Sequence, residues 1–168
     1  MSKNIREYSR MFKNIYARSR ISQNVHGCSK IVKIDKIDSV LPEADILYLA
    51  LPETPETKNL INNKRLNLLK SSCGIVNIGR QSAIDYDALC EKLKTKQLAG
   101  AILDVFEPEP IVNSSKLWNT PNLVITPHVS SDDHGSYVKM TLDLFFKNLK
   151  LFISNKELLN QINKDLGY

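Results

Sequence analysis

Residues 46–51 are Ile-Leu-Tyr-Leu-Ala-Leu, an apolar run without a charged side chain that ends at Pro52. A run of this length and composition is typical of a strand buried on both faces of a parallel sheet. Shorter apolar runs follow at 74–78, 99–103 and 123–125. We therefore predict four buried strands at these ranges.

Segments with helical spacing lie between and after these runs. The sequence favours a short helix over 60–69, an amphipathic helix over 86–95 and a long amphipathic helix over 138–153. Alternation of apolar strands with helices indicates an α/β fold, a parallel sheet covered by helices on both faces. Upstream of 46, we predict a helix over 4–13, a strand over 14–17, a mainly loop segment over 23–34 and a helical turn over 37–41.

Length and composition exclude several classes of protein. A chain of 168 residues, 42% hydrophobic, is the size of one domain. Its longest apolar run is far below the roughly 20 residues of a membrane helix, and the first residues lack the apolar segment of a signal peptide. Cys28, Cys73 and Cys90 are too scattered for a disulfide framework or a metal site. We expect a cytoplasmic protein without a metal or a membrane partner, in which Cys73 and Cys90 are small buried side chains.

The net charge of +5 is unevenly distributed, with +7 on residues 1–36 and −2 on the remainder. A basic end is found in nucleic-acid-binding proteins, but aromatic interleaving and known binding motifs are missing here. A solvated face or a pocket for a small anion needs only a few of these charges. We therefore expect no nucleic-acid partner.

Chemically active residues follow the predicted strands. In parallel sheets ligands bind beyond the carboxyl ends of the strands, so the loops after Leu51, Ile78, Leu103 and Ile125 should share one edge. An arginine grips a carboxylate with two parallel hydrogen bonds, and a histidine beside a carboxylate can act as a general acid. Such groups suit the reduction of a carbonyl that is flanked by a carboxylate, with hydride from a cofactor. The groups in these loops are Arg80, Asp104, Glu107, Glu109 and His128.

Six short strings occur in a characteristic order and spacing. They are Ala44-Asp45, Leu51-Pro-x-Thr-x-x-Thr57, Leu60-Ile-Asn62, Val76-Asn-Ile-Gly-Arg80, Leu103-Asp-Val-Phe-Glu-Pro-Glu-Pro110 and Ile125-Thr-Pro-His128. With these strings, residues 37–168 resemble the nucleotide-binding domain of the D-isomer-specific 2-hydroxyacid dehydrogenases. The resemblance implies a Rossmann-like sheet and an NAD(P)-dependent hydride transfer between the cofactor and a small 2-oxo or 2-hydroxy acid. The C-terminal end is similar to members that act on glyoxylate or hydroxypyruvate.

The resemblance implies roles for individual residues. Arg80 would bind the carboxylate and carbonyl of the substrate, His128 would be the acid/base, and Glu109 its pairing carboxylate. Glu107 is the rival to Glu109, which only the family spacing prefers. Asp104 would contact the nicotinamide carboxamide, and Leu51, Pro52 and Thr57 would lie near the adenosine-phosphate half. The remaining residues that would line the cofactor are Ile78, Gly79, Ser130 and Ser131, together with Arg80 and His128.

The chain also departs from the family pattern. Family members open this domain with a strand and a Gly-x-Gly-x-x-Gly turn, whose glycines let the cofactor pyrophosphate approach a helix N-terminus. Here the aligned positions are Met1, Lys3 and Arg6. We therefore expect the sheet to lack its first strand and glycine-rich turn. Residues 1–154 would form a truncated dinucleotide-binding domain, and 155–168 a tail that in the family packs toward a separate substrate domain.

Two further departures concern the cofactor and its surroundings. The position after the second strand usually carries an acid that binds the ribose 2′-hydroxyl of NAD. Here it is Ser19, between Arg18 and Arg20, which suits a 2′-phosphate and favours NADP. Gln81 replaces the usual glycine after the catalytic arginine, either crowding the cofactor or altering a turn.

The family's substrate domain has no counterpart in these 168 residues, so we interpret the chain as a truncated descendant, a fragment of a larger gene product or one part of a split protein. Two functional interpretations follow. The chain could work as an enzyme, as a homodimer or with a partner chain that supplies the missing domain. It could instead be a catalytically impaired remnant that acts as a binding or dimerisation module. Outside the family motifs, we expect His26 and His134 to be surface histidines, and Trp118, Phe145 and Phe146 to pack in a core or an interface.

Overall fold

The computed structural model describes residues 16–17, 30–133 and 135–164, and the chain divides into two compact units, 1–44 and 45–168. In the first unit, β1 (Tyr16–Ala17) pairs in parallel with β2 (Lys30–Ile31). Two 3₁₀ helices follow, η1 (Ile34–Ser39) and η2 (Leu41–Glu43), which confirms the predicted helical turn. The helix predicted over 4–13 lies outside the described residues.

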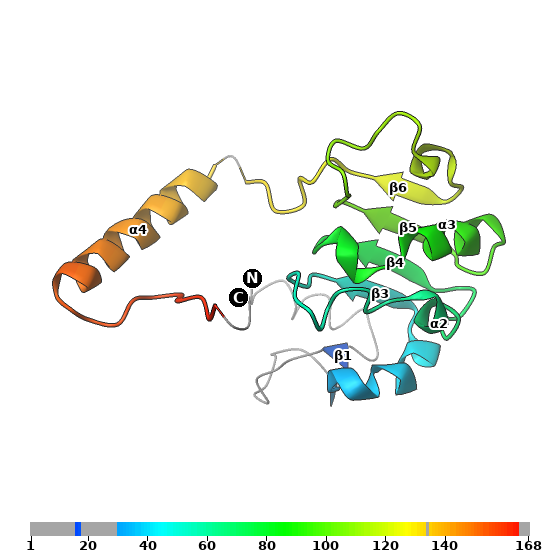
Figure 1. Cartoon of the computed structure of the whole chain (residues 1–168), viewed down its shortest axis with the longest axis horizontal. Helices are drawn as coiled ribbons and strands as arrows, with labels where there is room; N and C mark the ends of the chain where they lie inside the picture. Colours follow the sequence, from blue (N-terminus) through cyan, green and yellow to red (C-terminus); the bar gives the residue numbers. More distant parts are fainter. Residues whose placement is uncertain (1–15, 18–29, 134, 165–168) are drawn as a thin grey trace. The chain divides into compact units, whose positions relative to one another are not determined.

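The second unit is built on a four-stranded parallel sheet in the order β3-β4-β5-β6 (Figure 1). The strands are β3 (Ile46–Leu49), β4 (Gly74–Asn77), β5 (Gly100–Leu103) and β6 (Leu123–Ile125). All four lie inside the ranges predicted from the apolar runs. The parallel α/β class is confirmed.

Helices connect these strands, and side-chain caps mark where two of them begin. α2 (Asn63–Leu66) begins at Asn62, which accepts a hydrogen bond from the amide of Arg65. α3 (Tyr86–Lys94) begins at Asp85, whose side chain accepts from the amide of Ala88. The remaining elements are the 3₁₀ helices η3 (Gln81–Ala83) and η4 (Lys116–Asn119) and the long helix α4 (Tyr137–Ile153).

The helix over 60–69 is shorter than the sequence predicts, because its beginning is extended. Ile61 forms a parallel bridge with Ile84. The Ile61 amide donates to the carbonyl of Ala83 at 2.9 Å, and the Asp85 amide donates to the carbonyl of Ile61 at 3.1 Å. A backbone engaged in this pairing cannot also form the first helical turn.

The core lies on one face of the sheet. Ile75 and Leu103 of the strands are buried there, as are Leu89, Cys90 and Leu93 of α3. The burial predicted for Cys73 and Cys90 is confirmed. Side chains alternate between the two faces of a strand, so the residues between these core positions point to the opposite face.

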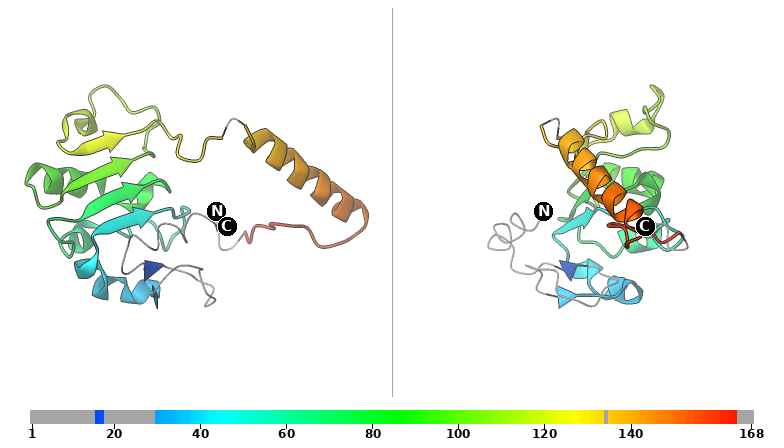
Figure 2. Two further views of the ribbon diagram at one scale, coloured as in Figure 1. Left: turned by 180° about the vertical axis from the view of Figure 1, so that it is seen from behind. Right: turned by 90° about the vertical axis from the view of Figure 1, so that its left-hand side faces the viewer.

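That opposite face is open among the described residues, so the expectation of strands buried on both faces is wrong. Tyr48, Val76, Ile102 and Val124 stand in register across all four strands, and three of them are 58%, 43% and 54% exposed (Tyr48, Ile102 and Val124). In Figure 2 (left) the strands are seen without a helix in front of them. Core packing therefore uses a single layer of connecting helices.

Helix α4 carries a further set of exposed apolar side chains. No residue of α4 is buried, and the rings of Phe145 and Phe146 contact each other edge to face at a centroid distance of 5.4 Å. Trp118 is also exposed, with its indole N–H donating to the carbonyl of Val112. These three aromatic residues do not belong to the core.

Within the described residues, no helix combines the length and hydropathy that a membrane crossing requires.

Candidate functional site

The carboxyl ends of the four strands form one edge. Leu49 is in register with Asn77, Asn77 with Leu103, and Leu103 with Ile125. Because the strands are parallel, the loops that follow these residues all leave at this edge. The expectation that the four loops share an edge is confirmed.

Gly79 allows two of these loops to touch. A Cβ atom at Gly79 would lie 2.5 Å from the amide nitrogen of Leu51 and 2.6 Å from its carbonyl oxygen. Backbone atoms cannot move away as a flexible side chain would, so a larger residue does not fit here. The amide of the neighbouring Ile78 donates to the carbonyl of Leu49 at 2.9 Å. Leu51, Ile78 and Gly79, three of the predicted cofactor residues, are thus brought together.

Arg80 follows Gly79 and is exposed at the edge. Its Nη1 atom donates to the carbonyl of Gly79 at 2.8 Å. The fully buried Asn77 holds the backbone on either side, because its Nδ2 donates to the Arg80 carbonyl and its Oδ1 accepts from the Gly79 amide. In the described part of the chain no carboxylate pairs with this guanidinium. The side chain therefore has donors to offer to an anion.

Glu109 and His128 meet across two loops. The Nδ1 atom of His128 lies 2.9 Å from Oε2 of Glu109, and Oε1 accepts from the amide of Phe106 at 2.7 Å. The hydrogen bond from His128, then that from Phe106, lowers the pKa of Glu109 below its usual range. Glu107 remains exposed. Of the two rival carboxylates, Glu109 is the one that pairs with the histidine.

Asp104 anchors the loop that carries His128. Its fully buried carboxylate accepts hydrogen bonds from the Thr126 hydroxyl, from the Val129 amide at 3.0 Å and from the Ser130 amide at 2.9 Å. Burial alone would raise the pKa of Asp104, but these hydrogen bonds lower it to about 2. The donors lie on both sides of His128, whose φ of 55° is in the left-handed region. The buried charge thus holds a conformation that few residues adopt.

Thr57 stabilises the loop after β3 from the inside. Its hydroxyl donates to the carbonyl of Pro52 at 2.6 Å and accepts from the amide of Thr54 at 2.8 Å. Thr57 is buried, whereas Pro52 is exposed. The hydroxyl therefore shapes the loop in which the sequence predicts contacts to the adenosine-phosphate half of a cofactor.

The described residues do not cover every predicted position. Ser19 and Arg20, predicted at the ribose, and Met1, Lys3 and Arg6, at the phosphate turn, lie outside them, as do His26 and His134. Ser131 is exposed in the loop after His128. Gln81 opens the 3₁₀ helix η3 and so takes part in a turn. Among the described residues, no cluster of three or more potential ligands is placed to hold a metal ion.

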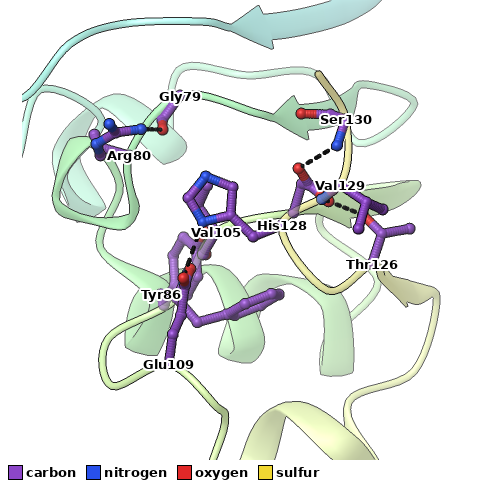
Figure 3. Close-up of polar contacts among 11 residues, drawn as sticks. Gly79, Arg80, Tyr86, Val105, Glu109, Thr126, His128, Val129 and Ser130 are labelled. Carbon is purple, nitrogen blue, oxygen red and sulfur yellow. Dashed lines mark hydrogen bonds and ion pairs between the residues drawn. The ribbon is translucent and has the colours of Figure 1, made fainter. Parts of the chain in front are cut away.

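Two buried polar residues of the site were missed by sequence reasoning. Asn77 ends an otherwise apolar strand, and Tyr86 begins α3. Figure 3 shows Tyr86 beside Val105, in the same view as Arg80, Glu109 and His128. For Asn77, the signal in the sequence was a polar residue at the end of an apolar run. Only its burial in the structure shows that this residue supports the site.

Comparison with known proteins identifies the family. The model of the D-isomer specific 2-hydroxyacid dehydrogenase NAD binding domain matches residues 5–130, well over half of the chain. The chain belongs to the D-isomer-specific 2-hydroxyacid dehydrogenase family. The domain matched in this family is the one that binds NAD.

Curated relatives include reductases and dehydrogenases of different substrates. A glyoxylate reductase from Pyrococcus horikoshii is 42% identical over 116 residues, which are 69% of this chain and 34% of that protein. A D-3-phosphoglycerate dehydrogenase from Escherichia coli is 32% identical over 135 residues, 78% of this chain and 33% of that protein. The chain thus spans about a third of each of these two dehydrogenases.

Solved structures of the family have the same fold. An NADPH-dependent glyoxylate/hydroxypyruvate reductase from Sinorhizobium meliloti, in complex with NADP and sulfate, has a TM-score of 0.87 and 27% identity. That match covers 99% of this chain and 53% of the other. A 2-hydroxyacid dehydrogenase from Xanthobacter autotrophicus Py2, in complex with NADPH and MES, has a TM-score of 0.84 and 30% identity, with 92% and 63% covered. The Rossmann-like class of the fold is confirmed.

Proposed function

We propose that the chain is the catalytic, cofactor-binding part of an NAD(P)-dependent oxidoreductase that reduces a small 2-oxo acid to the 2-hydroxy acid. The observation that carries the proposal is the 2.9 Å contact between His128 and Glu109 at the edge where Arg80 is exposed. Family membership supports the same reaction. Glyoxylate is the substrate class named for the relative from Pyrococcus horikoshii.

Each of the three side chains has a distinct task in this proposal. The Arg80 guanidinium pairs with the substrate carboxylate and orients the neighbouring carbonyl. Glu109 engages Nδ1 of His128, so Nε2 is the atom left to give a proton to the carbonyl oxygen. Nicotinamide, when bound, supplies the hydride to the carbonyl carbon. Proton and hydride together convert the carbonyl to a hydroxyl.

The cofactor would lie along the described edge. Gly79 has no side chain where the loops after β3 and β4 touch, so the backbones of the two loops come together there. Ile78, Gly79, Ser130 and Ser131 would line the cofactor there. We assign Ser19 and Arg20 to its 2′-phosphate, which makes NADP the preferred form.

The proposal includes a partner and a compartment. The chain spans about a third of the reductase from Pyrococcus horikoshii and of the dehydrogenase from Escherichia coli. The partner that we propose is a second copy or a second chain, which contributes to the wall of the substrate pocket. The exposed apolar side chains of α4 offer a surface for that contact. Free buried thiols at Cys73 and Cys90 suit a reducing compartment, and we place the protein in the cytoplasm.

Turnover measurements test the proposed function. We expect the chain to oxidise NADPH in the presence of glyoxylate or hydroxypyruvate, and His128→Ala to lower kcat by roughly 10²- to 10⁴-fold, the usual contribution of a general acid. Circular dichroism of the variant controls for folding. Absence of both turnover and cofactor binding in the wild type would contradict the proposal and favour the binding-module interpretation.

A further inference from the structure

Asn77 and Tyr86 form a buried polar pair beneath the candidate site. They are 0% and 7% exposed, and the Asn77 Nδ2 atom donates to the Tyr86 hydroxyl at 3.1 Å. Asn77 is the last residue of β4, and Tyr86 is the first of α3. The pair thus joins a strand end to a helix start, and no role in the proposed reaction has been given to it.

This pair contacts both of the loops that carry the proposed catalytic groups. On one side, Asn77 donates to the carbonyl of Arg80 at 3.0 Å. On the other, the Tyr86 hydroxyl donates to the carbonyl of Val105 at 2.8 Å (Figure 3). The loop after β4 and the loop after β5 are therefore tied together through two side chains.

The contact with Val105 bears directly on Glu109. The ring of Tyr86 meets the ring of Phe106 edge to face, with centroids 6.3 Å apart. The amide of Phe106, the residue that follows Val105, donates to Oε1 of Glu109 at 2.7 Å. Tyr86 thus contacts both Val105 and Phe106, and the Phe106 amide is one of the two groups that hold the Glu109 carboxylate.

The hydroxyl, and not only the ring, is required by this arrangement. Among the described residues every buried side-chain polar atom has a hydrogen-bond partner. Burial raises the pKa of Tyr86 well above its usual range, so the phenol stays neutral and keeps its proton to donate. A phenylalanine would fill the same space but leave the Val105 carbonyl without this donor.

We propose that Tyr86 is a positioning residue, whose hydroxyl fixes the loop after β5 and through it the orientation of Glu109 toward His128. The part of the inference that concerns catalysis rests on the proposed function. The part that concerns geometry does not rest on it, so the titration of Glu109 and the turnover rate are measured separately.

The test compares Tyr86→Phe with Tyr48→Phe, the same substitution at an exposed tyrosine of β3. Carbon-13 NMR of the Glu109 carboxyl, assigned with Glu109→Gln, follows its titration without any need for turnover. We expect Tyr86→Phe to raise the pKa of Glu109 toward the ordinary range, because the His128 and Phe106 hydrogen bonds weaken. Tyr48→Phe should leave the titration unchanged.

Kinetics supply the second readout. We expect Tyr86→Phe to lower kcat about tenfold, equivalent to loss of about 1.4 kcal/mol, with an unchanged KM for NADPH. If the wild type has no turnover, the proposed function fails while the titration still decides the role of Tyr86. A folded Tyr86→Phe whose Glu109 titrates as in the wild type would overturn the inference.

Hydrogen exchange on the wild type decides the matter if Tyr86→Phe does not fold. The amides of Phe106 and Gly79 donate to Glu109 and Asn77, at opposite ends of the network. We expect both amides to be protected with the same opening free energy, since one cooperative unit holds them. An unprotected Phe106 amide beside a protected Gly79 amide would overturn the inference.

Discussion

Glu109 uses both of its carboxylate oxygens, one for His128 Nδ1 at 2.9 Å and the other for the Phe106 amide at 2.7 Å. The second contact comes from the carboxylate's own loop, so it orients Glu109 before any substrate arrives. A carboxylate held in this way can fix the ring plane and tautomer of a histidine.

The first prediction concerns the choice between two neighbouring glutamates. We expect Glu109→Gln to lower kcat by roughly 10- to 100-fold, because the protonated imidazole loses its charged partner. Glu107→Gln is the matched control, since Glu107 is exposed and two residues away. Steady-state oxidation of NADPH with glyoxylate measures both. Equal losses in the two variants would contradict the assignment.

The second prediction concerns Asp104 and acid stability. Its pKa of about 2 in the folded protein lies below the ordinary 3.8, so the folded state prefers the ionised form. The stabilisation is complete above about pH 4 and is lost as the pH falls toward 2, and it amounts to about 2 kcal/mol. Urea unfolding across this pH range measures the loss in the wild type.

Asp104→Asn removes the same stabilisation at neutral pH. The buried amide group faces backbone donors that need an acceptor, so we expect the free energy of unfolding to fall by about 2 kcal/mol. The difference from wild type should shrink as the pH approaches 2. Asp143→Asn on the exposed surface of α4 is the control. A pH-independent difference would show that the charge of Asp104 is not responsible.

The third prediction compares Gly79, in the loop after β4, with Gly74, the first residue of β4. At Gly79 a Cβ would lie 2.5 Å from a backbone nitrogen, whereas at Gly74 the nearest atom is 4.0 Å away. We expect Gly79→Ala to destabilise the protein by about 1–3 kcal/mol, as overpacking does, and to weaken cofactor binding. Gly74→Ala should be close to neutral. Thermal unfolding compares the two, and equal melting temperatures would argue against the close contact.

The fourth prediction concerns the cofactor. Two guanidinium groups beside Ser19 should favour a ribose 2′-phosphate, so calorimetry is expected to give tighter binding of NADPH than of NADH. Arg20→Ala should reduce the affinity for NADPH and leave that for NADH nearly unchanged. Equal affinities of the wild type for the two cofactors would remove the proposed preference.

The fifth prediction concerns association through α4. Its exposed apolar side chains include Phe145 and Phe152, and burial of such rings between chains is favourable. We expect light scattering to show a species heavier than one chain at micromolar concentration, and Phe145→Ser with Phe152→Ser to reduce its mass. Lys139→Ser on the same helix is the control. A stable wild-type monomer would count against a partner at this surface.

Much of the sheet could be predicted from local sequence. The apolar runs at 46–51 and 123–125 specify strands, because such side chains favour burial in a sheet. The helix predicted over 60–69 was too long, because Ile61 pairs with Ile84. That pairing depends on a residue distant in the sequence.

The sequence by itself determined which residues follow the strand ends, and hence which groups share the edge, because parallel pairing places those ends together. Only the tertiary structure decided between Glu107 and Glu109, since the distance to His128 depends on how two loops fold. It also decided that Asn77, Tyr86 and Asp104 are buried. Burial depends on neighbours from several elements, and no local pattern encodes it.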